Sequence, residues 1–454
     1  MIPAESFLTS SLRGAPQGEA VARILAAAVA AVEPGDAVGR QVRLEGLVLT
    51  VAGRAYDLSA FRRIRMLGIG KASAGMAEAL AGILGRRLDS ALVITKHAPA
   101  PSAVHRPWPV VLGGHPVPDE RSLAAGEAAL ELLSELEDGD LLFCLISGGG
   151  SALAVAPVEG VSLADIQSLT ATLLACGARI DEINRLRRRL DRLKGGGVAR
   201  TANGATVVSL ILSDVVGDAL ESIASGPTAP DPTTRSDARA VIEKYGLGSQ
   251  VPASILTALE SSAETARPGD ALFERVQNAI VGSNLLAAQA ALKQAAQEGF
   301  HPYLLRADLQ GEARQAAFEL ATLLRQAKQT GAPVPAPACL LAGGETTVTL
   351  TGDGRGGRNT ELALAAVREL AGFPGVMLVA LATDGEDGPT LTADCAAGAV
   401  VTGETYRRAR ELGLQTGEHL RRNDSYAFFA ALDDLLKPGP TGTNVNDLVF
   451  LFAL

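Results

Sequence analysis

The sequence predicts an α/β protein of two domains, in which helices cover both faces of largely parallel sheets. Length is the first reason, because the chain has 454 residues and one domain commonly holds about 100–200 residues. Composition is the second: 47% of the residues are hydrophobic and 49 are glycines, which suits buried strands joined to helices by tight turns. The third is order, since apolar runs of strand length alternate with amphipathic stretches, the pattern of βαβ units.

The first series of elements has the strand–helix alternation of a Rossmann-like parallel sheet. Residues 19–32 carry apolar side chains at helical spacing, and Pro34 with Gly35 ends the pattern. The wholly apolar run at residues 141–146 is typical of a strand buried on both faces. The strands predicted in this series are residues 64–68, 91–95, 141–146 and 206–212, and the later helices are residues 73–84, 123–137 and 163–175.

A second series follows a segment rich in proline, threonine and aspartate. The sequence SGPTAPDPTT at residues 225–234 restricts the chain to extended or turn geometry, so we predict domains at residues 1–240 and 241–454. The second α/β domain is expected to contain a mixed sheet, with a hairpin formed by a GGE turn and a polar strand. The strands predicted here are residues 278–281, 303–305, 338–342, 346–350, 376–381 and 449–452, and the helices are residues 285–297, 311–330 and 360–370.

Charge and composition exclude several classes of partner. The formal net charge is −9 and aromatic residues make up only 4% of the chain, which disfavours attraction to nucleic acid and leaves few rings for base stacking. The longest apolar runs fall far short of a bilayer span, and the first residues lack the basic start and apolar run of a signal peptide. No C-x-x-C pair is present, and only His115 among the histidines stands in a loop with other polar groups. We expect a cytoplasmic protein that binds neither nucleic acid nor membranes.

The loop GIGKASAG at residues 68–75 lies between a predicted strand and a predicted helix, where backbone N–H groups can approach an anion. It is not a Walker A loop, because Arg65 stands where that motif needs a glycine. Nor is it a full dinucleotide fingerprint, because Ser73 replaces the last glycine. Gly70 and Lys71 are therefore candidate phosphate ligands, and the alternative is a tight turn with a solvated lysine.

A second glycine-rich loop, SGGGSAL, follows the apolar strand at residues 141–146. Three glycines and two serines at the carboxyl end of a buried strand form a candidate anion-binding nest. The loop lacks the G-x-S-x-G of a serine-hydrolase elbow, which disfavours hydrolysis, and a turn needed only for packing is the alternative. The candidate nucleotide-binding residues of this loop are Ser147, Gly148, Gly149, Gly150 and Ser151.

A basic run and an acidic loop come next along the chain. Residues 183–197 read INRLRRRLDRLKGGG, and Lys194 followed by three glycines suits the approach of a phosphate, although a solvated basic helix face is the default interpretation. Asp214 and Asp218 come just after the strand at residues 206–212. Such carboxylates can hold Mg²⁺, accept a hydroxyl proton, or simply cap the next helix.

The densest group of charges and glycines lies at residues 342–365. Gly343 and Glu345, which follow a predicted strand, are candidate nucleotide-binding residues, and Arg358 stands in a glycine loop where it would reach a ligand easily. Asp384 follows the next buried strand and is a second candidate for binding Mg²⁺. The acidic residues there do not have the spacing of an EF-hand, so calcium is not expected.

Taken in chain order, these loops resemble the motifs of one family. GIGKAS, GGHPVPDE, ISGGGSAL, INRLRRRLDRLKGG, LSDVVGD, IASGPTAPD, GGETTV, GGRNTELALA, ATDGEDGPT and GPTGTNVNDL follow one another along the chain. From about residue 10 to the C-terminus the sequence is similar to the class II glycerate 2-kinase family, which has an N-terminal kinase-like domain and a C-terminal MOFRL domain. It departs from the family at Arg189 and Asp191, where a histidine and a serine are common.

The resemblance implies an ATP-dependent kinase that phosphorylates D-glycerate at its 2-hydroxyl, giving 2-phosphoglycerate and ADP. It also implies an active site in the cleft between the two domains, with the family's catalytic lysine at Lys71 and its essential arginine at Arg358. In this interpretation Asp214 or Asp384 holds Mg²⁺ or takes the hydroxyl proton, and the glycine-rich loops bind ATP.

Two alternatives stay open, as does the oligomeric state. Members of this family have also been named hydroxypyruvate reductases, so NAD(P)H-dependent reduction is the main alternative. The second predicted strand ends at Lys96 and His97, where a nicotinamide-binding unit usually offers an acidic ribose ligand, which favours the kinase. A non-catalytic binding protein is less consistent with charges of both signs in several loops. The chain is expected to be a monomer or a homodimer.

Overall fold

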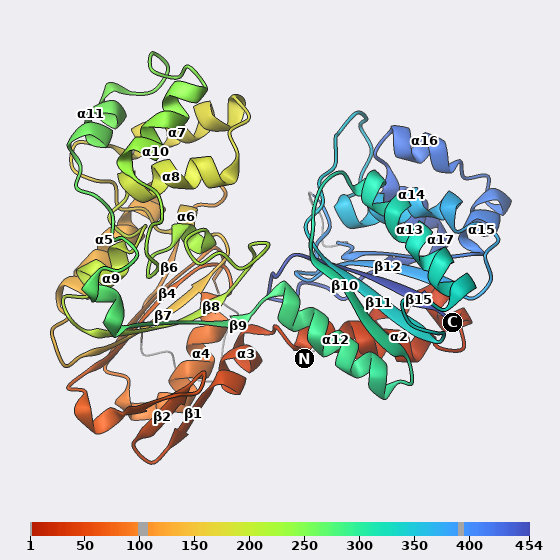
Figure 1. Ribbon diagram of the computed structural model, residues 1–454, viewed down its shortest axis with the longest axis horizontal. Helices are drawn as coiled ribbons and strands as arrows, with labels where there is room; N and C mark the ends of the chain where they lie inside the picture. The colour runs from red at the N-terminus through yellow and green to blue at the C-terminus, as the bar shows by residue number, and fades with distance from the viewer. Residues whose placement is uncertain (1, 99–107, 389–394) are drawn as a thin grey trace. The chain divides into compact units, whose positions relative to one another are not determined.

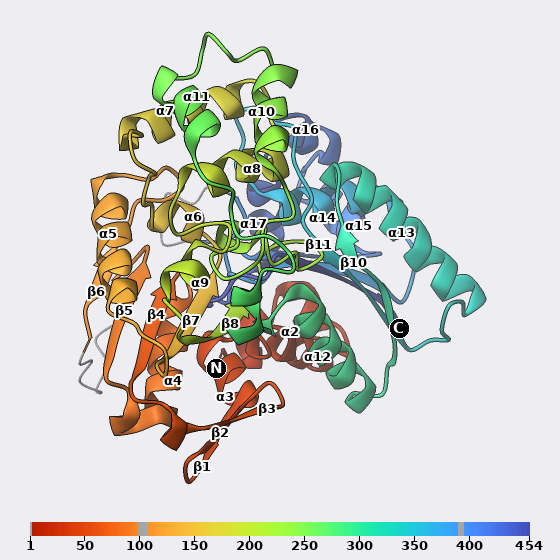
Figure 2. The same ribbon diagram turned by 60° about the vertical axis from the view of Figure 1, so that its left-hand side comes forward.

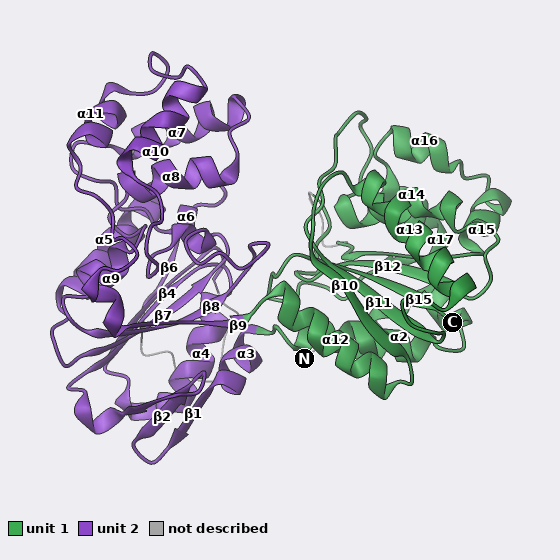
Figure 3. Ribbon diagram, in the orientation of Figure 1, with its two compact units in different colours: residues 1–33, 282–454 green, residues 34–281 purple. Residues whose placement is uncertain are grey.

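The computed structural model describes residues 2–98, 108–388 and 395–454. It divides into two compact units (Figure 3): unit 1 contains residues 1–33 and 282–454, and unit 2 contains residues 34–281. Each unit has its own sheet with helices packed on it (Figures 1 and 2). The predicted two-domain α/β class is therefore confirmed.

Unit 2 is built on a sheet that has six strands within its described residues. In spatial order they are β6 (Val110–Leu112), β5 (Ser90–Thr95), β4 (Ile64–Ile69), β7 (Leu141–Ser147), β8 (Thr206–Leu212) and β9 (Val276–Gly282). Strands β6, β5, β4, β7 and β8 pair in parallel, as the alternating pattern predicts. The helices next to this sheet are α4 (Ser73–Leu84), α5 (Glu120–Ser134), α6 (Gly150–Leu153) and α9 (Gly197–Thr201). One core lies between the sheet and α5, where Leu67 and Ile146 pack with Ala129 and Leu133.

Two smaller layers complete unit 2 (Figure 1). Helices α7 (Leu163–Ala175), α8 (Ile180–Leu190), α10 (Arg235–Lys244) and α11 (Ala253–Ser261) form a cluster around their own core, which contains Leu169, Leu186 and Ile255. Strands β1 (Val42–Glu45), β2 (Val48–Val51) and β3 (Arg54–Asp57) form an antiparallel sheet that the sequence patterns did not predict. The other elements of unit 2 are α3 (Pro34–Gln41) and the 3-10 helices η2 (Leu58–Ala60), η3 (Gly85–Arg87), η4 (Ile223–Ser225) and η5 (Ala271–Arg275).

Unit 1 contains the predicted mixed sheet. In spatial order its strands are β10 (His301–Leu309), β11 (Ala338–Gly344), β15 (Asp447–Ala453), β12 (Val376–Ala382), β13 (Gly398–Thr402) and β14 (Leu435–Leu436). Strands β10 and β11 are parallel, whereas β15 runs antiparallel to both β11 and β12. Figure 1 shows α2 (Gly18–Ala30) and α12 (Asn284–Gln297) on one face of this sheet and α13 (Ala313–Thr330) and α14 (Arg358–Glu369) on the other. The other elements are η1 (Ala4–Phe7), α1 (Ser10–Gly14), α15 (Thr405–Glu411), α16 (Thr416–Arg421) and α17 (Ser425–Leu432).

The bounds of the compact units differ from the predicted domains at residues 1–240 and 241–454. Helix α2 packs against α12, so residues 1–33 belong with the C-terminal sheet. Helix α11 packs on α8 and α10, and β9 lies beside β8, so the chain from residue 241 to 281 stays in unit 2. The proline-rich segment thus lies inside unit 2, because the contacts that close its sheet come from chain beyond that segment.

One predicted strand is not formed. Residues 346–350 were expected to pair in a hairpin after GGE, but β11 already has β10 and β15 as neighbours, which leaves no free edge beside it. Thr347 makes an isolated bridge to Glu312 instead, and the Thr349 amide donates to the Glu312 carboxylate at 3.2 Å.

Membrane spans were searched among the helices of the described residues. None of these helices combines the length and the apolar character needed to cross a lipid bilayer.

Candidate active site

The candidate residues of unit 2 lie where β4, β7 and β8 end. Parallel pairing sets Ser147 of β7 opposite Leu212 of β8, and β4 ends beside β7. The loops after these three strands therefore leave the sheet at one edge, the usual place for a ligand site in an open α/β sheet. Lys71 and Asp214, which the sequence analysis singled out separately, are brought to this edge together with Ser147.

The first two glycine-rich loops are tied to each other by backbone contacts. Gly70 has a φ of 138°, and a Cβ there would lie 2.2 Å from the Ser147 hydroxyl oxygen, so only glycine fits. The Lys71 amide donates to the Gly148 carbonyl at 3.0 Å, and the Ala72 amide donates to the Ser147 hydroxyl at 3.0 Å. Ser147 is buried, so Gly70 and Ser147 shape the site while the Lys71 side chain remains exposed.

Asp214 lies directly against the second glycine-rich loop. A Cβ on Gly148 would stand 1.9 Å from Oδ2 of Asp214, so the carboxylate occupies space that any larger residue would need. Burial raises the pKa of the Asp214 carboxyl, and the positive charge of Lys71 opposes this rise. A carboxylate with a raised pKa is better suited to accept a proton than an exposed aspartate.

Lys71 and His115 meet on the neighbouring glycine of this loop. A Cβ on Gly149 would lie 3.2 Å from Cε of Lys71 and 3.1 Å from Cδ2 of His115. The pKa of His115 is lowered to about 4, chiefly by burial and then by the positive charge of Lys71, with Lys96 and His97 contributing further. His115 is therefore neutral at physiological pH. It was not predicted as a site residue, and its place in the polar loop GGHPVPDE was the only signal.

A strained turn supports the end of the second glycine-rich loop. Gly150 begins α6, and the hydroxyl of the next residue, Ser151, lies 2.8 Å from the hydroxyl of buried Ser225. Ala224 and Ser225 have φ values of 49° and 61°, in the left-handed region. Such a conformation costs on the order of 1–3 kcal/mol for each non-glycine residue and is concentrated at functional sites. Ser225 was not predicted as a site residue, because the sequence IASGPT resembles an ordinary turn.

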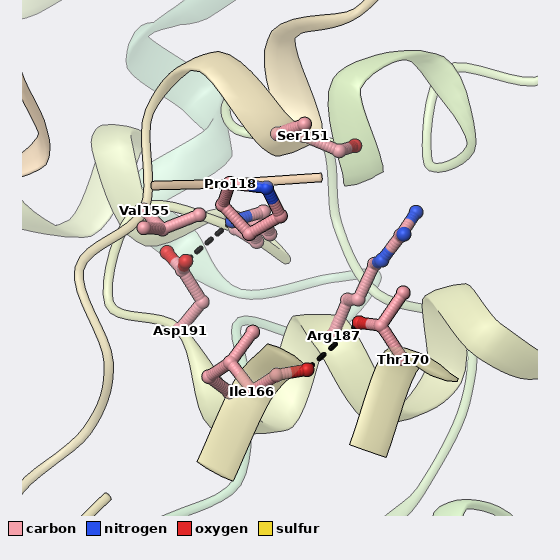
Figure 4. A pocket seen from close by; sticks show the side chains of 9 residues that line it. Pro118, Ser151, Val155, Ile166, Thr170, Arg187 and Asp191 are labelled. Atoms are coloured by element: carbon pink, nitrogen blue, oxygen red, sulfur yellow. Dashed lines mark hydrogen bonds and ion pairs between the residues drawn. The ribbon is translucent and has the colours of Figure 1, made fainter. Parts of the chain in front are cut away.

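Lys194 is buried in an ion pair. Its ammonium group pairs with the carboxylate of Asp191 and donates to the Ala154 carbonyl at 3.3 Å. Burial lowers the pKa of Lys194, and Asp191 opposes that change. Lys194, Asp191 and Ser151 line a small pocket within unit 2 (Figure 4).

The second group of candidate residues lies in unit 1, around Arg358 at the start of α14. The guanidinium binds Asp447 through two hydrogen bonds of 2.5 and 3.1 Å and forms an ion pair of 2.9 Å with Glu345. Register explains the arrangement, because Asp447 at the start of β15 stands opposite Gly344 of β11 and Ala382 of β12. Asp447 was not predicted; it closes the polar loop GPTGTNVND, which could equally have been a simple turn.

Further carboxylates surround this arginine. Asp387 accepts hydrogen bonds from the amides of Asn359 (2.9 Å) and Thr360 (2.7 Å), and so caps α14. Asp384 follows β12, and its pKa is raised to about 6, first by burial, with Asp447 and Glu386 adding to the rise.

Gly343 lies at the same end of the sheet and is needed for packing. A Cβ there would stand 1.8 Å from Oδ1 of Asn284, whose amide group donates to the carbonyls of Val445 and Asp447, both at 2.9 Å. Gly343 therefore keeps Asn284 against the loop that carries Asp447.

The acidic side chains fit a magnesium ion that is held in part by substrate. Within the described residues, no three His, Cys, Asp or Glu side chains are grouped so as to hold a metal ion alone. Mg²⁺ is commonly bound by one or two carboxylates together with substrate phosphates. Asp384 suits this role, because its half-buried carboxylate lies in the field of Asp447 and a cation would favour its ionised form.

Two family models match the chain. Residues 20–260, more than half of the chain, match the domain of unknown function DUF4147. Residues 338–447 match the MOFRL family. The first match contains Lys71 and Asp214, and the second contains Arg358 and Asp384.

Relatives match over nearly the whole chain. A glycerate 2-kinase of Pyrococcus horikoshii is 37% identical over 430 residues, which cover 94% of this chain and 95% of that protein. A glycerate kinase of Homo sapiens is 38% identical over 502 residues, which cover 98% of this chain and 94% of that protein. The solved structure of a glycerate kinase from Thermotoga maritima has a TM-score of 0.84 and 37% identity, and the match covers 95% of this chain and 98% of that one.

The fold, the paired family models and the strand-end loops define a two-domain α/β protein of the DUF4147 and MOFRL type. The chain belongs to the class II glycerate kinase family. The resemblance carried by its ten motifs is thereby confirmed, and the roles of individual residues stay predictions.

Proposed function

We propose that this chain is a glycerate 2-kinase, which transfers the γ-phosphoryl group of ATP to the 2-hydroxyl of D-glycerate and releases 2-phosphoglycerate and ADP. One observation carries the proposal: the Lys71 side chain lies against the same glycine loop that Asp214 approaches. A cation, a glycine loop and a carboxylate with a raised pKa are what phosphoryl transfer needs, because catalysis there rests on positioning and charge neutralisation. The names of the relatives supply the substrate.

In unit 2, Asp214 is proposed to take the proton of the reacting hydroxyl. Burial raises its pKa, which makes the carboxylate a stronger base than free aspartate. Lys71 supplies a flexible point charge toward the phosphoryl oxygens. The neutral imidazole of His115 packs on the same loop and adds no repulsion to the cation.

In unit 1, Arg358 is proposed to neutralise charge on the transferred group. Asp447 and Glu345 hold its guanidinium in one orientation, which reduces the entropy lost when it binds a phosphoryl group. Asp384 would hold Mg²⁺, with Asp214 as the second candidate ligand. When bound, the ion would neutralise charge on the ATP phosphates.

Reduction of hydroxypyruvate with NAD(P)H is less well supported. Strand β5 ends at Thr95 and is followed by Lys96 and His97, where a nicotinamide cofactor would need an acidic partner for its ribose. We propose further that the protein acts in the cytoplasm on dissolved ATP and D-glycerate, without nucleic acid, as a monomer or homodimer.

The test is a direct assay of the purified protein. ATP, Mg²⁺ and D-glycerate are mixed with it and ADP release is followed, with omission of Mg²⁺ and of glycerate as controls. We expect ADP to be released only when both Mg²⁺ and D-glycerate are present. Oxidation of NADH or NADPH by hydroxypyruvate, with no ADP released from ATP, would replace it by the reductase.

A further inference from the structure

The pocket beside the second glycine-rich loop takes no part in the steps above. It is formed within unit 2 by residues of α6, α7 and α8 and of the chain after α8 (Figure 4). Its polar lining is contributed by Ser151, Thr170, Arg187, Asp191 and Lys194.

The pocket carries one positive charge that is in the field of Asp191 but makes no ion pair among the described residues. Lys194 and Asp191 neutralise each other in an ion pair. Arg187 is half-buried, and among the residues that the structure describes it has no carboxylate within ion-pair distance. Burial lowers its pKa, which reflects the cost of holding the guanidinium away from water. Because the whole chain has a net charge of −9, a half-buried arginine that has no carboxylate paired directly with it indicates a site for an anionic ligand.

A chain of hydroxyl groups fixes the hydrogen-bonding role of Ser151. The Ser225 hydroxyl donates to the Asn184 side-chain oxygen at 3.1 Å, which uses its single proton. Ser151, whose oxygen lies 2.8 Å from that of Ser225, must then donate its own proton to Ser225. The remaining lone pairs of the Ser151 oxygen can only accept a hydrogen bond. On the pocket side, this hydroxyl therefore suits a ligand that donates a hydrogen bond.

Asn184 links this chain to the arginine. Its side-chain oxygen also lies 3.5 Å from Nη1 of Arg187, one helical turn further along α8. Asn184 is buried and therefore held in place. One amide thus orients both the cation and, through Ser225, the accepting hydroxyl.

We propose that this pocket binds the hydroxy-acid substrate, with Arg187 on its carboxylate, Ser151 accepting from one of its hydroxyls, and Asn184 positioning both. The inference rests on the proposed function and deepens it. A carboxylate beside a hydroxyl donor satisfies both groups at once. An ionised nucleotide phosphate offers Arg187 an acceptor but gives Ser151 no donor, so the pocket suits a hydroxy acid better than a phosphate group.

The first test compares Michaelis constants. In Arg187→Gln the KM for D-glycerate should rise on the order of 10- to 100-fold, as expected for the loss of a charge-assisted hydrogen bond, while the KM for ATP stays unchanged. Arg192→Gln is the matched control, because this nearby arginine is exposed and lies outside the pocket. A raised KM for ATP with an unchanged KM for glycerate would assign Arg187 to the nucleotide and overturn the proposal. If Arg187→Gln does not fold, Arg187→Lys should show the same direction with a smaller rise.

The second test measures binding without turnover. Calorimetry with D-glycerate and with its uncharged amide, glyceramide, in the absence of ATP, should show that the wild-type protein prefers the acid and that Arg187→Gln loses this preference. Equal preference in both proteins overturns the inference even if the enzyme releases ADP. A wild-type protein that binds glycerate through Arg187 but releases no ADP overturns only the proposed kinase.

Asn184 is tested as a positioning residue. Asn184→Ala should raise the KM for glycerate and leave that for ATP unchanged. In the double variant with Arg187→Gln, the rise should be smaller than the product of the single rises, since one residue acts through the other. A fully multiplicative effect would show that Asn184 acts independently and contradict this role.

Discussion

The raised pKa of Asp384 predicts a pH-dependent gain in stability when this residue is replaced by asparagine. The pKa of this carboxyl rises from 3.8 to about 6, mainly through burial. Each pKa unit corresponds to about 1.4 kcal/mol, so holding the ionised carboxylate in the folded protein costs up to about 3 kcal/mol. Below pH 3.8 the carboxyl is protonated in both states and the cost vanishes; it grows between pH 3.8 and 6 and is complete above pH 6. Asp384→Asn removes the charge and keeps an oxygen that can accept from the Glu386 amide.

The assay is urea unfolding in the presence of EDTA at a series of pH values. Asp384→Asn should be more stable than the wild-type protein by up to about 3 kcal/mol at pH 7.5, and the two should converge near pH 4. Asp353→Asn is the matched control, because Asp353 lies in the same unit with its side chain 84% exposed and makes only a surface ion pair with Arg422, so its replacement should change the free energy of unfolding by less than about 1 kcal/mol. A constant difference between Asp384→Asn and wild type at every pH would refute the reasoning, because a packing effect does not titrate.

Two further predictions concern the loops of unit 2. Lys71→Met should abolish ADP release without lowering the melting temperature, since the side chain is exposed. In the same variant, NMR titration should show the pKa of His115 rising from about 4 toward 6.5, because the positive charge of Lys71, the second-largest cause of the low pKa after burial, is removed. An unchanged pKa of His115 in this variant would contradict the proximity of Lys71 and His115. Gly148→Ala places a Cβ 1.9 Å from the Asp214 carboxylate, so it should destabilise the protein by about 1–3 kcal/mol in urea unfolding and lower kcat. Gly82→Ala is its control: it lies in α4 with open space around the added methyl group, and it should be neutral or stabilising, whereas equal losses in both variants would exclude the clash.

Much of the fold follows from local pattern, because fully apolar runs of strand length, such as residues 141–146, are typical of strands buried on both faces. The bounds of the units do not follow from it. Helix α2 has an amphipathic pattern that fits either unit, and its place on α12 depends on contacts across more than 250 residues of chain. The strand expected at residues 346–350 fails for a similar reason, since its pairing depended on which strands would flank β11.

The site residues show the same division. Lys71 and Arg358 stand in glycine-rich loops, and that local signal was enough to single them out. Asp447 and Ser225 lie in polar loops with no such signal, and their importance comes from register and from a strained backbone. Arg187 is one of several arginines in α8, and only the folded helix shows that it faces a pocket while Arg188 pairs with Asp231.

The most direct test of the central claim is the ³¹P NMR spectrum of the product formed from ATP, Mg²⁺ and D-glycerate. Transfer to the 2-hydroxyl joins the phosphorus through the ester oxygen to a carbon that carries one hydrogen. The new ester signal should therefore be a doublet when protons are not decoupled. A triplet would mean that the 3-hydroxyl was phosphorylated and would contradict the proposed position of transfer. No ester signal at all, with ATP left intact, would contradict the kinase assignment itself.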